Sequence, residues 1–214
     1  MRVLIACEES QTVCKAFRER GHDAYSCDIQ ECSGGHLEWH IIGDAIKTAY
    51  EGNWDLMIGH PPCTYLSYVG NRWFNYQRYG EQALRRYQSR LDAVNFFIKL
   101  WNAPIDKICL ENPRGYIQEF VQATQLIHPY YFGDSQSKAT LLWLKGLPQL
   151  VHQKEESLFG DKITHVDKGE MALHGSESEA FFGLHILKLP QAERAKIRSK
   201  TFEGIAKAMA EQWG

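Results

Sequence analysis

The chain has 214 residues, of which 44% are hydrophobic and 23% are charged, so it can bury a sizeable core and is no disordered polyelectrolyte. Its net charge of −2 excludes a general polycation, and six cysteines are too few for a disulfide scaffold. The sequence contains neither an apolar run long enough for a transmembrane helix nor a signal peptide. We therefore expect a cytoplasmic protein with no membrane partner.

The first half of the chain alternates short apolar runs with polar segments. Strands are predicted at residues 2–7, 23–27 and 54–59, and residues 40–45 are either a short strand or a turn. Ser10 is placed to cap a helix that runs to about residue 20 and ends at Gly21.

Residues 64–101 carry six Lys or Arg and two Asp or Glu. Residues 64–79 are predicted to be a loop rich in aromatic residues and arginine. Residues 81–101 are predicted to be an amphipathic helix, because apolar residues recur at steps of three and four at Leu84, Tyr87, Leu91, Val94, Ile98 and Trp101. These arginines either form a nucleic-acid-binding face or only cover the exposed side of the helix.

The second half is predicted to continue the alternation. A strand at 107–111 is followed by a helix near 116–124 and by strands near 127–132 and 139–144. Residues 145–183 are polar and irregular, and the chain ends in a helix. Pro190 suits its first turn, and one face carries Phe202, Ile205, Ala206 and Met209.

This alternation predicts an α/β fold with a mainly parallel sheet, as a single domain over residues 1–214. Ligands of such folds bind beyond the carboxyl ends of the strands. The predicted strand ends carry chemically useful groups, namely Cys7-Glu8-Glu9, Asp28, His60-Pro61-Pro62-Cys63 and Glu111-Asn112-Pro113.

Cys63 and Glu111 suggest one particular reaction. A thiolate at Cys63 can add to C6 of a pyrimidine while Glu111, with a pKa raised by partial burial, protonates N3. C5 then becomes electron-rich and can attack an electrophilic carbon. For each residue alone the plainer alternative is a structural role.

Asp28 follows the second strand, where an acid can accept hydrogen bonds from the hydroxyls of a ribose. The alternative is a turn or capping role. The first turn has no G-x-G-x-x-G pattern, so a pyrophosphate site is unsupported and an adenosine without phosphates fits better.

With these residues the sequence resembles the DNA cytosine-5 methyltransferases, especially their short phage- and prophage-type members, over most of its length. Residues 2–28 look like the first cofactor motif, and Gly43-Asp44 is similar to a short motif whose Asp contacts the adenine. Residues 55–67, DLMIGHPPCTYLS, look like the Pro-Cys motif, and residues 110–113 like the Glu-Asn motif. Residues 136–140 stand in the place of a Gln-x-Arg-x-Arg motif, and residues 201–214 look like the closing motif.

The resemblance implies a class I methyltransferase fold, S-adenosylmethionine as methyl donor and DNA, double- or single-stranded, as partner in a bacterial host cell. It implies that Cys63 is the nucleophile, that Glu111 protonates N3 and that Lys138 assists. The implied cofactor-binding residues are Cys7, Glu8, Glu9, Asp28, Asp44, His60, Pro61, Thr201 and Gly204. The implied substrate-binding residues are Pro62, Asn112, Arg72 and Arg78, the two arginines in a mobile loop over a base flipped out of the duplex.

The sequence departs from the family pattern in three places. Cys7-Glu8-Glu9 replaces the glycine-rich first turn, and either acid there meets the cofactor amine or caps the next helix. Lys138 replaces an Arg, which keeps the charge and loses the bidentate fork. Residues 145–183, the segment for target recognition, are short and acidic, which suggests a very short site, single-stranded DNA or a partner subunit.

Three other interpretations remain open from the sequence. The spacing of Cys27, Cys32, His36 and His40 offers four zinc ligands, but it is too short for a finger and we expect no metal. A catalytically silent relative would bind DNA or S-adenosylmethionine as a regulator or anti-restriction factor. The same chemistry would also suit free pyrimidine nucleotides or RNA.

Overall fold

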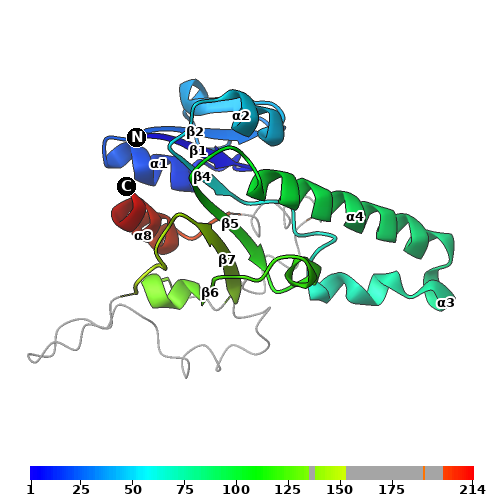
Figure 1. Ribbon diagram of the computed structural model, residues 1–214. Helices are drawn as coiled ribbons and strands as arrows, with labels where there is room; N and C mark the ends of the chain where they lie inside the picture. Colours follow the sequence, from blue (N-terminus) through cyan, green and yellow to red (C-terminus); the bar gives the residue numbers. More distant parts are fainter. Residues whose placement is uncertain (135–137, 153–189, 191–199) are drawn as a thin grey trace, which may run out of the picture.

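The computed structural model describes residues 1–134, 138–152, 190 and 200–214. Seven strands form one sheet in the order β3-β2-β1-β4-β5-β7-β6. They are β1 (Arg2–Ala6), β2 (Asp23–Asp28), β3 (His40–Ile42), β4 (Leu56–Gly59), β5 (Lys107–Pro113), β6 (Gln125–Ile127) and β7 (Thr140–Lys145). The first five strands in chain order are parallel, and β7 is antiparallel to both β5 and β6. The predicted α/β class with a mainly parallel sheet is confirmed (Figure 1).

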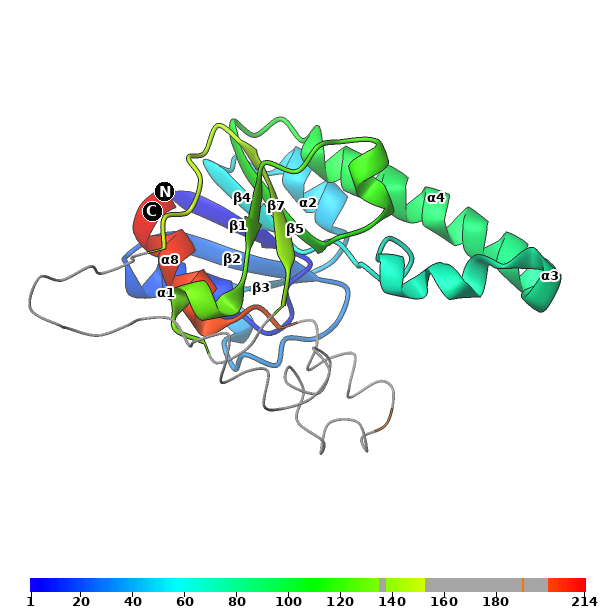
Figure 2. The same ribbon diagram turned by 90° about the horizontal axis from the view of Figure 1, so that it is seen from below.

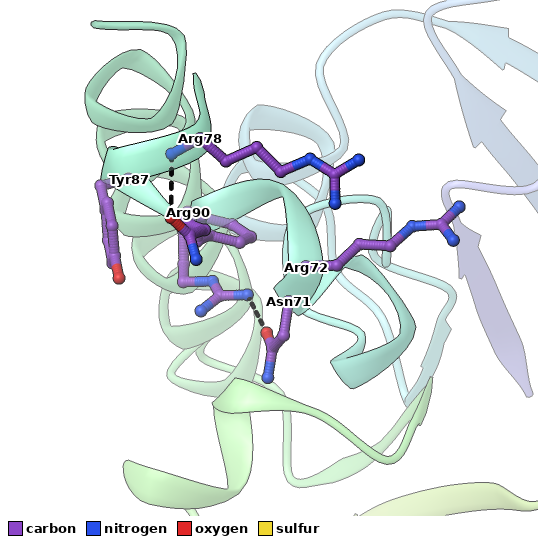
Figure 3. A pocket seen from close by; sticks show the side chains of 7 residues that line it. Asn71, Arg72, Arg78, Tyr87 and Arg90 are labelled. Carbon is purple, nitrogen blue, oxygen red and sulfur yellow. Dashed lines mark hydrogen bonds between the residues drawn. The ribbon is translucent and has the colours of Figure 1, made fainter. Parts of the chain in front are cut away.

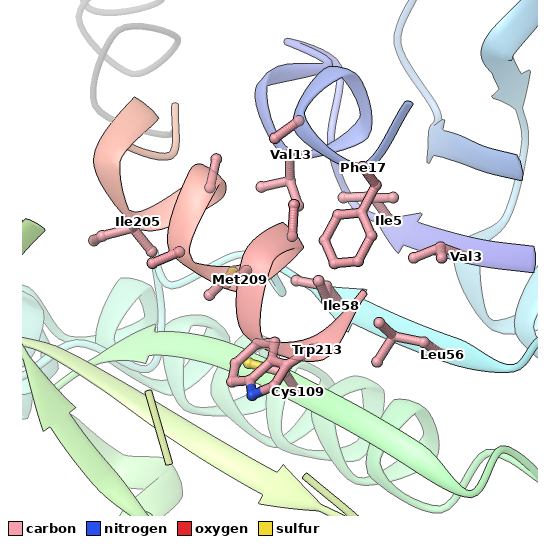
Figure 4. Packing of buried hydrophobic residues seen from close by; sticks show 14 of the residues in the cluster. Val3, Ile5, Val13, Phe17, Leu56, Ile58, Cys109, Ile205, Met209 and Trp213 are labelled. Carbon is pink, nitrogen blue, oxygen red and sulfur yellow. The ribbon is translucent and has the colours of Figure 1, made fainter. Parts of the chain in front are cut away.

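Helices cover both faces of the sheet (Figure 2). On one face, α1 (Thr12–Glu19) and α8 (Glu203–Trp213) bury Phe17 and Met209 against Ile5 of β1 and its neighbours in β4 and β5 (Figure 4). On the other face, α2 (Ala45–Glu51) and the carboxyl-terminal half of α4 (Glu81–Trp101) pack over Leu4 and Met57. Successive residues of β1 alternate between the two cores because strand side chains have a period of two.

An arm formed by η2 (Tyr68–Phe74), α3 (Tyr76–Tyr79) and the amino-terminal half of α4 extends away from the sheet (Figures 1 and 2). At about 1.5 Å per residue, the 21 residues of α4 are about 31 Å long. The prediction of a loop over 64–79 is therefore wrong in its second part. Phe74 is buried there, edge-on to Tyr87 of α4 at 5.0 Å, which holds this segment along the helix.

The predicted apolar stripe of α4 is wrong in the amino-terminal half of the helix. Leu84, Tyr87 and Leu91 are each about half exposed, because this half has left the sheet. The residues that α4 does bury are Ala83, Arg90, Val94, Phe97 and Leu100.

Three further local predictions need correction. Helix α2 is missing from the predicted elements, although Asp44 caps it by accepting from the backbone N–H of residues 46 and 47. Residues 116–124 contain only a 3-10 turn, η3 (Tyr116–Glu119). In the segment 127–132, where a strand is predicted, the strand ends at Ile127 and Pro129 begins a further 3-10 turn, η4 (Pro129–Phe132). Proline cannot donate to a strand ladder, which explains the early stop. One more 3-10 turn, η1 (Leu37–Trp39), precedes β3.

The last described helix, α8, starts at Glu203. Pro190 is expected in the first turn of the final helix, and the residues that would follow it there, 191–199, lie outside the described ranges. The predicted target-recognition segment likewise lies mostly in 153–189, also outside them. In the described part, no helix has the length and apolar character needed to span a membrane.

Candidate functional site

The register of the sheet places four predicted site residues in one row. Ala6 pairs with Cys27 and with Gly59, and Gly59 pairs with Leu110. One residue further along each strand stand Asp28, Cys7, His60 and Glu111, in that spatial order. With adjacent strands about 4.8 Å apart, the row spans roughly 14 Å from Asp28 to Glu111. It lies at the carboxyl ends of β2, β1, β4 and β5, where folds of this kind bind ligands.

Cys7, Asp28 and Asp44 form the first half of this edge. Cys7 has a positive φ of 61°, which turns the chain sharply after β1. Burial raises the pKa of its thiol, and the negative charges of Asp28 and Asp44 raise it further. Asp28 Oδ1 accepts the N–H of Gln30 at 2.9 Å, and Asp44 Oδ1 caps α2. A thiol in this setting stays protonated and is no nucleophile.

Glu8 and Glu9 are both buried, at 4% and 7% exposure. Glu8 accepts from the backbone N–H of Val13 at 2.7 Å and of Cys14 at 3.2 Å, so its carboxylate caps α1, the second of its two expected roles. Burial raises the pKa of Glu8, against the opposing influence of nearby His60 and the two N–H donors. Ser10, predicted to be the cap, contacts the Thr12 hydroxyl instead, at 3.2 Å.

Glu111, His60, Thr201 and Lys138 form the second half of the edge. His60 Nδ1 lies 3.2 Å from Glu111 Oε2 and 3.4 Å from the Thr201 hydroxyl oxygen. The side chains of His60 and Glu111 are only 7% and 14% exposed. His60 Nε2 and Glu111 Oε1 are buried without a hydrogen-bond partner among the described residues. Two buried polar atoms therefore remain available to a bound molecule.

The pKa of Glu111 is lower than that of an ordinary glutamic acid. Burial alone raises it, but the positive charge of Lys138 and the contact with His60 lower it by more. The carboxyl group is thus ionised at neutral pH, which is opposite to the raised pKa expected from its semi-buried position. The sequence position of Glu111 could not reveal this lowering of its pKa. Lys138 lies two residues before β7, and only the antiparallel pairing of β7 with β5 relates it to Glu111.

Cys63 is exposed and lies four residues beyond the end of β4. Its carbonyl oxygen accepts the N–H groups of Leu66 and Ser67 at 3.1 and 2.9 Å, so a tight turn begins at Cys63. Asn112 is 1% exposed and donates from Nδ2 to Pro61 O at 2.7 Å. This bond ties the loop that carries Pro62 and Cys63 to the strand that carries Glu111.

The remaining predicted residues lie on either side of this edge. Gly204 is the second residue of α8 and packs against η4, where an added Cβ would collide with Phe132 O and come within 2.7 Å of Asp134 Oδ2. Arg72 and Arg78 stand on the arm, away from the strand ends. The arm is packed structure rather than a loop, and it contacts the Cys63 turn through Arg86 Nη2, which donates to Thr64 O at 3.3 Å.

Three of the four residues of the zinc interpretation have other partners. Cys27 contacts the Thr48 hydroxyl, His40 lies between Ser26 and Gln30 O, and His36 contacts Glu38. No group of three or more His, Cys, Asp or Glu side chains in the described ranges is arranged to hold a metal ion.

Arg90 is the functional candidate that the sequence reasoning misjudges. The sequence places it on the exposed side of α4, but only 6% of it is exposed. A signal is present in the spacing, because Arg90 is four residues before Val94 and seven before Phe97, on the helix face that the structure buries.

No protein-family model and no curated protein matches the chain. Among solved structures, one match is a prophage-encoded protein of E. coli described as a "putative DNA modification methyltransferase". The TM-score is 0.42 and the identity 14%, with 67% of this chain and 46% of that chain covered. The chain thus spans less than half the length of that protein, and the likeness identifies neither its family nor its function.

Proposed function

We propose that the protein methylates C5 of cytosine in DNA, using S-adenosylmethionine. The observation that carries the proposal is the row formed by Asp28, Cys7, His60 and Glu111, with Cys63 on a turn tied to the same edge by Asn112. One end of the row supplies acceptors for an adenosine. The other end supplies the carboxyl group of Glu111, and the proposed nucleophile Cys63 lies on the turn tied to it.

The Asp28 end suits an adenosine. Its ribose hydroxyls and exocyclic amine are hydrogen-bond donors, and the carboxylates of Asp28 and Asp44 are acceptors. Cys7, Glu9, His60, Pro61, Thr201 and Gly204 would border the molecule, while Glu8 would fix the start of α1 beneath it. S-adenosylmethionine, when bound, supplies an electrophilic methyl group to C5.

Cys63 supplies the nucleophile. Its sulfur forms a bond to C6 of cytosine, and the electron pair of the C5–C6 double bond becomes available at C5. After methylation a base removes the proton at C5 and the C5–C6 double bond forms again. The Sγ–C6 bond breaks with its electron pair returning to sulfur, and N3 gives its proton back to Glu111. Pro62 and Asn112 hold the turn so that the thiol faces the base.

Glu111 holds the proton at N3. Because its carboxyl is ionised before the base binds, the proton must reach it, and His60 Nδ1 at 3.2 Å is the adjacent group that can deliver one. Addition of sulfur to C6 makes N3 strongly basic, and a carboxyl of low pKa, once protonated, readily transfers its proton to it. Lys138 stabilises the carboxylate that remains after the transfer.

The target base must leave the duplex stack to reach Cys63, which is the reason that base flipping belongs to the proposal. Arg72 and Arg78 on the arm would contact the nucleic-acid backbone.

The test is methyl transfer from labelled S-adenosylmethionine to duplex DNA, single-stranded DNA, RNA and free dCMP, with the product nucleoside identified by mass spectrometry. We expect label in 5-methylcytosine for DNA and no label with Cys63→Ala. Cys32→Ala, which removes a partly exposed cysteine with no assigned role, should keep wild-type activity. Full activity of a folded Cys63→Ala would refute the mechanism.

A trapping experiment separates catalysis from binding alone. Cys63 should form a lasting covalent adduct with DNA that contains 5-fluorocytosine, because fluorine at C5 prevents elimination. S-adenosylmethionine binding without adduct and without transfer would favour a regulatory binding protein. Transfer only to RNA or dCMP would replace DNA as the substrate.

Two substitutions test the other roles. Glu111→Gln should slow transfer strongly and leave the dissociation constant of S-adenosylmethionine, measured by calorimetry, unchanged. Asp28→Ala should weaken that binding, and an unchanged dissociation constant would remove Asp28 from the cofactor site.

A further inference from the structure

The arm contains a hollow of about 490 Å³ between η2, α3 and α4 (Figure 3). Three of its seven lining residues are arginines, and no carboxylate lines it; the residues are Asn71, Arg72, Phe74, Asn75, Arg78, Tyr87 and Arg90. A concave surface with several guanidinium groups and amide side chains is suited to an anion.

Arg90 forms the floor of the hollow and is a buried cation. Its Nε donates to Tyr65 O at 2.8 Å and its Nη2 to Asn71 Oδ1 at 2.6 Å, both neutral oxygens. Its guanidinium lies 3.5 Å from the centre of the Phe74 ring. Within the described ranges, no carboxylate forms an ion pair with it. Burying a charge is costly unless an opposite charge accompanies it, so an anion from outside would complete this site.

Arg72 and Arg78 stand at the rim. Figure 3 shows both side chains extending in the same direction, away from α4, whereas the Arg90 guanidinium lies apart from their ends, beside Asn71. They rest beside aromatic rings, Arg72 at 4.9 Å from Trp73 and Arg78 at 5.5 Å from Tyr79. Neither makes an ion pair with a described residue, whereas the neighbouring Arg85 is paired with Glu81 at 3.8 Å.

We propose that this hollow binds a backbone phosphodiester of the nucleic-acid substrate. The inference rests on the proposed function for the identity of the polymer. A guanidinium group matches two phosphate oxygens at once, and the asparagine amides that line the hollow are further donors. The site lies on the arm, so it locates nucleic-acid binding outside the segment 145–183.

The arm also connects the phosphate to the reacting centre. Arg90 donates to the backbone of Tyr65, and Arg86 to that of Thr64, the two residues that follow Cys63. The arm and the residues after Cys63 also form a second hollow of about 250 Å³, lined by Tyr65, Trp73, Tyr79, Gln82, Arg85, Arg86 and Ser89. A phosphate held over Arg90 would therefore fix the strand at a set offset from Cys63, with aromatic rings beside it for stacking of bases.

The test is binding of a labelled oligonucleotide, duplex and single-stranded, by fluorescence anisotropy at several salt concentrations. Arg72→Ala combined with Arg78→Ala should weaken binding about tenfold or more. It should also reduce the slope of log Kd against log salt by about 0.7–0.9 for each phosphate that the protein no longer neutralises. The matched control combines Lys47→Ala with Arg20→Ala, two exposed cations away from the arm that are paired with glutamates. It should change the slope much less.

Arg90→Lys is the second variant, because it keeps the buried charge and removes the fork. It should retain a folded thermal transition and still weaken binding. Inorganic phosphate and dCMP serve as competitors, and we expect neither to displace the oligonucleotide at millimolar concentration. Displacement by dCMP would assign the hollow to a free nucleotide and overturn the proposal.

The proposal also fails if wild type binds no oligonucleotide, or if the double variant keeps both Kd and salt slope. The 5-fluorocytosine adduct separates the two proposals. A normal adduct with an unchanged slope rejects the hollow alone, whereas no adduct with a reduced slope rejects the methylation alone.

Discussion

The contact between His60 and Glu111 gives the sharpest test of the site, because the same chain holds a matched pair at its surface. His60 and Glu111 approach to 3.2 Å with side chains 7% and 14% exposed. His36 and Glu38 approach to the same 3.2 Å with side chains 40% and 63% exposed. The distance from Nδ1 to the carboxylate oxygen is equal in the two pairs and the burial is not. A difference in coupling free energy between the pairs therefore reports the effect of burial.

The expected magnitude follows from a hydrogen bond to a buried carboxylate, which contributes about 1.5–3 kcal/mol. His60→Leu removes one of the two influences that lower the pKa of Glu111, so that pKa rises. A carboxyl with a lowered folded pKa stabilises the protein above its ordinary value of 4.5, and this stability is lost as pH falls through the folded pKa. The loss in His60→Leu should therefore be largest at neutral pH and shrink below pH 4.5.

The measurement is a double-mutant cycle of His60→Leu and Glu111→Gln by urea unfolding at pH 7. We expect a coupling free energy of about 1.5–3 kcal/mol for this pair. The cycle of His36→Leu and Glu38→Gln should give a much smaller value, because solvent screens an exposed pair. Equal coupling in both cycles, or coupling below about 0.5 kcal/mol for the buried pair, would refute the assignment of His60 as the partner that positions Glu111.

Three further predictions concern packing near the site. Gly204→Ala should lower the free energy of unfolding by about 1–3 kcal/mol, since an added Cβ meets the backbone of η4, whereas Gly43→Ala, with open space at its Cβ, should cost much less; urea unfolding compares them. Asn112→Ala should cost about 1–3 kcal/mol, because it leaves Pro61 O without its donor, and should slow adduct formation by Cys63; unchanged stability would contradict this. Phe97→Ala should lower the free energy of unfolding by about 3–5 kcal/mol, because Phe97 is fully buried against Trp143. Thermal unfolding measures this loss, and a much smaller loss would contradict the prediction.

Local patterns in the sequence predict the strands of the sheet well. β1, β4 and the first part of β5 are largely apolar runs, and the cysteine and polar residues at or next to the ends of β1, β2, β4 and β5 mark the edge at which the row lies. The register that aligns Asp28 with Glu111 needed the three-dimensional structure, since parallel pairing joins segments more than 20 residues apart.

The arm shows why the rest could not be predicted. Periodicity places Leu84 and Leu91 on the buried face of α4, which holds for a helix that lies on a sheet along its whole length. Half of α4 has no sheet beneath it, and its inner face packs on η2 instead, with Arg90 buried and Leu84 exposed. The direction in which Lys138 approaches Glu111 is equally invisible in the sequence, because it depends on how β7 pairs with β5.

The missing glycine of the first turn has a structural explanation that bears on the cofactor. Cys7 and Gln11 both have a positive φ, 61° and 59°, so the chain after β1 adopts the conformation for which glycine is usually needed. Gln11 is fully buried, accepts from His36 N at 3.1 Å and donates to His36 O at 2.7 Å, which fastens the loop before η1 over the turn. Strain at two residues is thus offset by a clamp that glycine would not provide. The absence of a glycine motif therefore does not weigh against an adenosine ligand at Asp28, because the chain after β1 reaches two positive-φ positions without glycine.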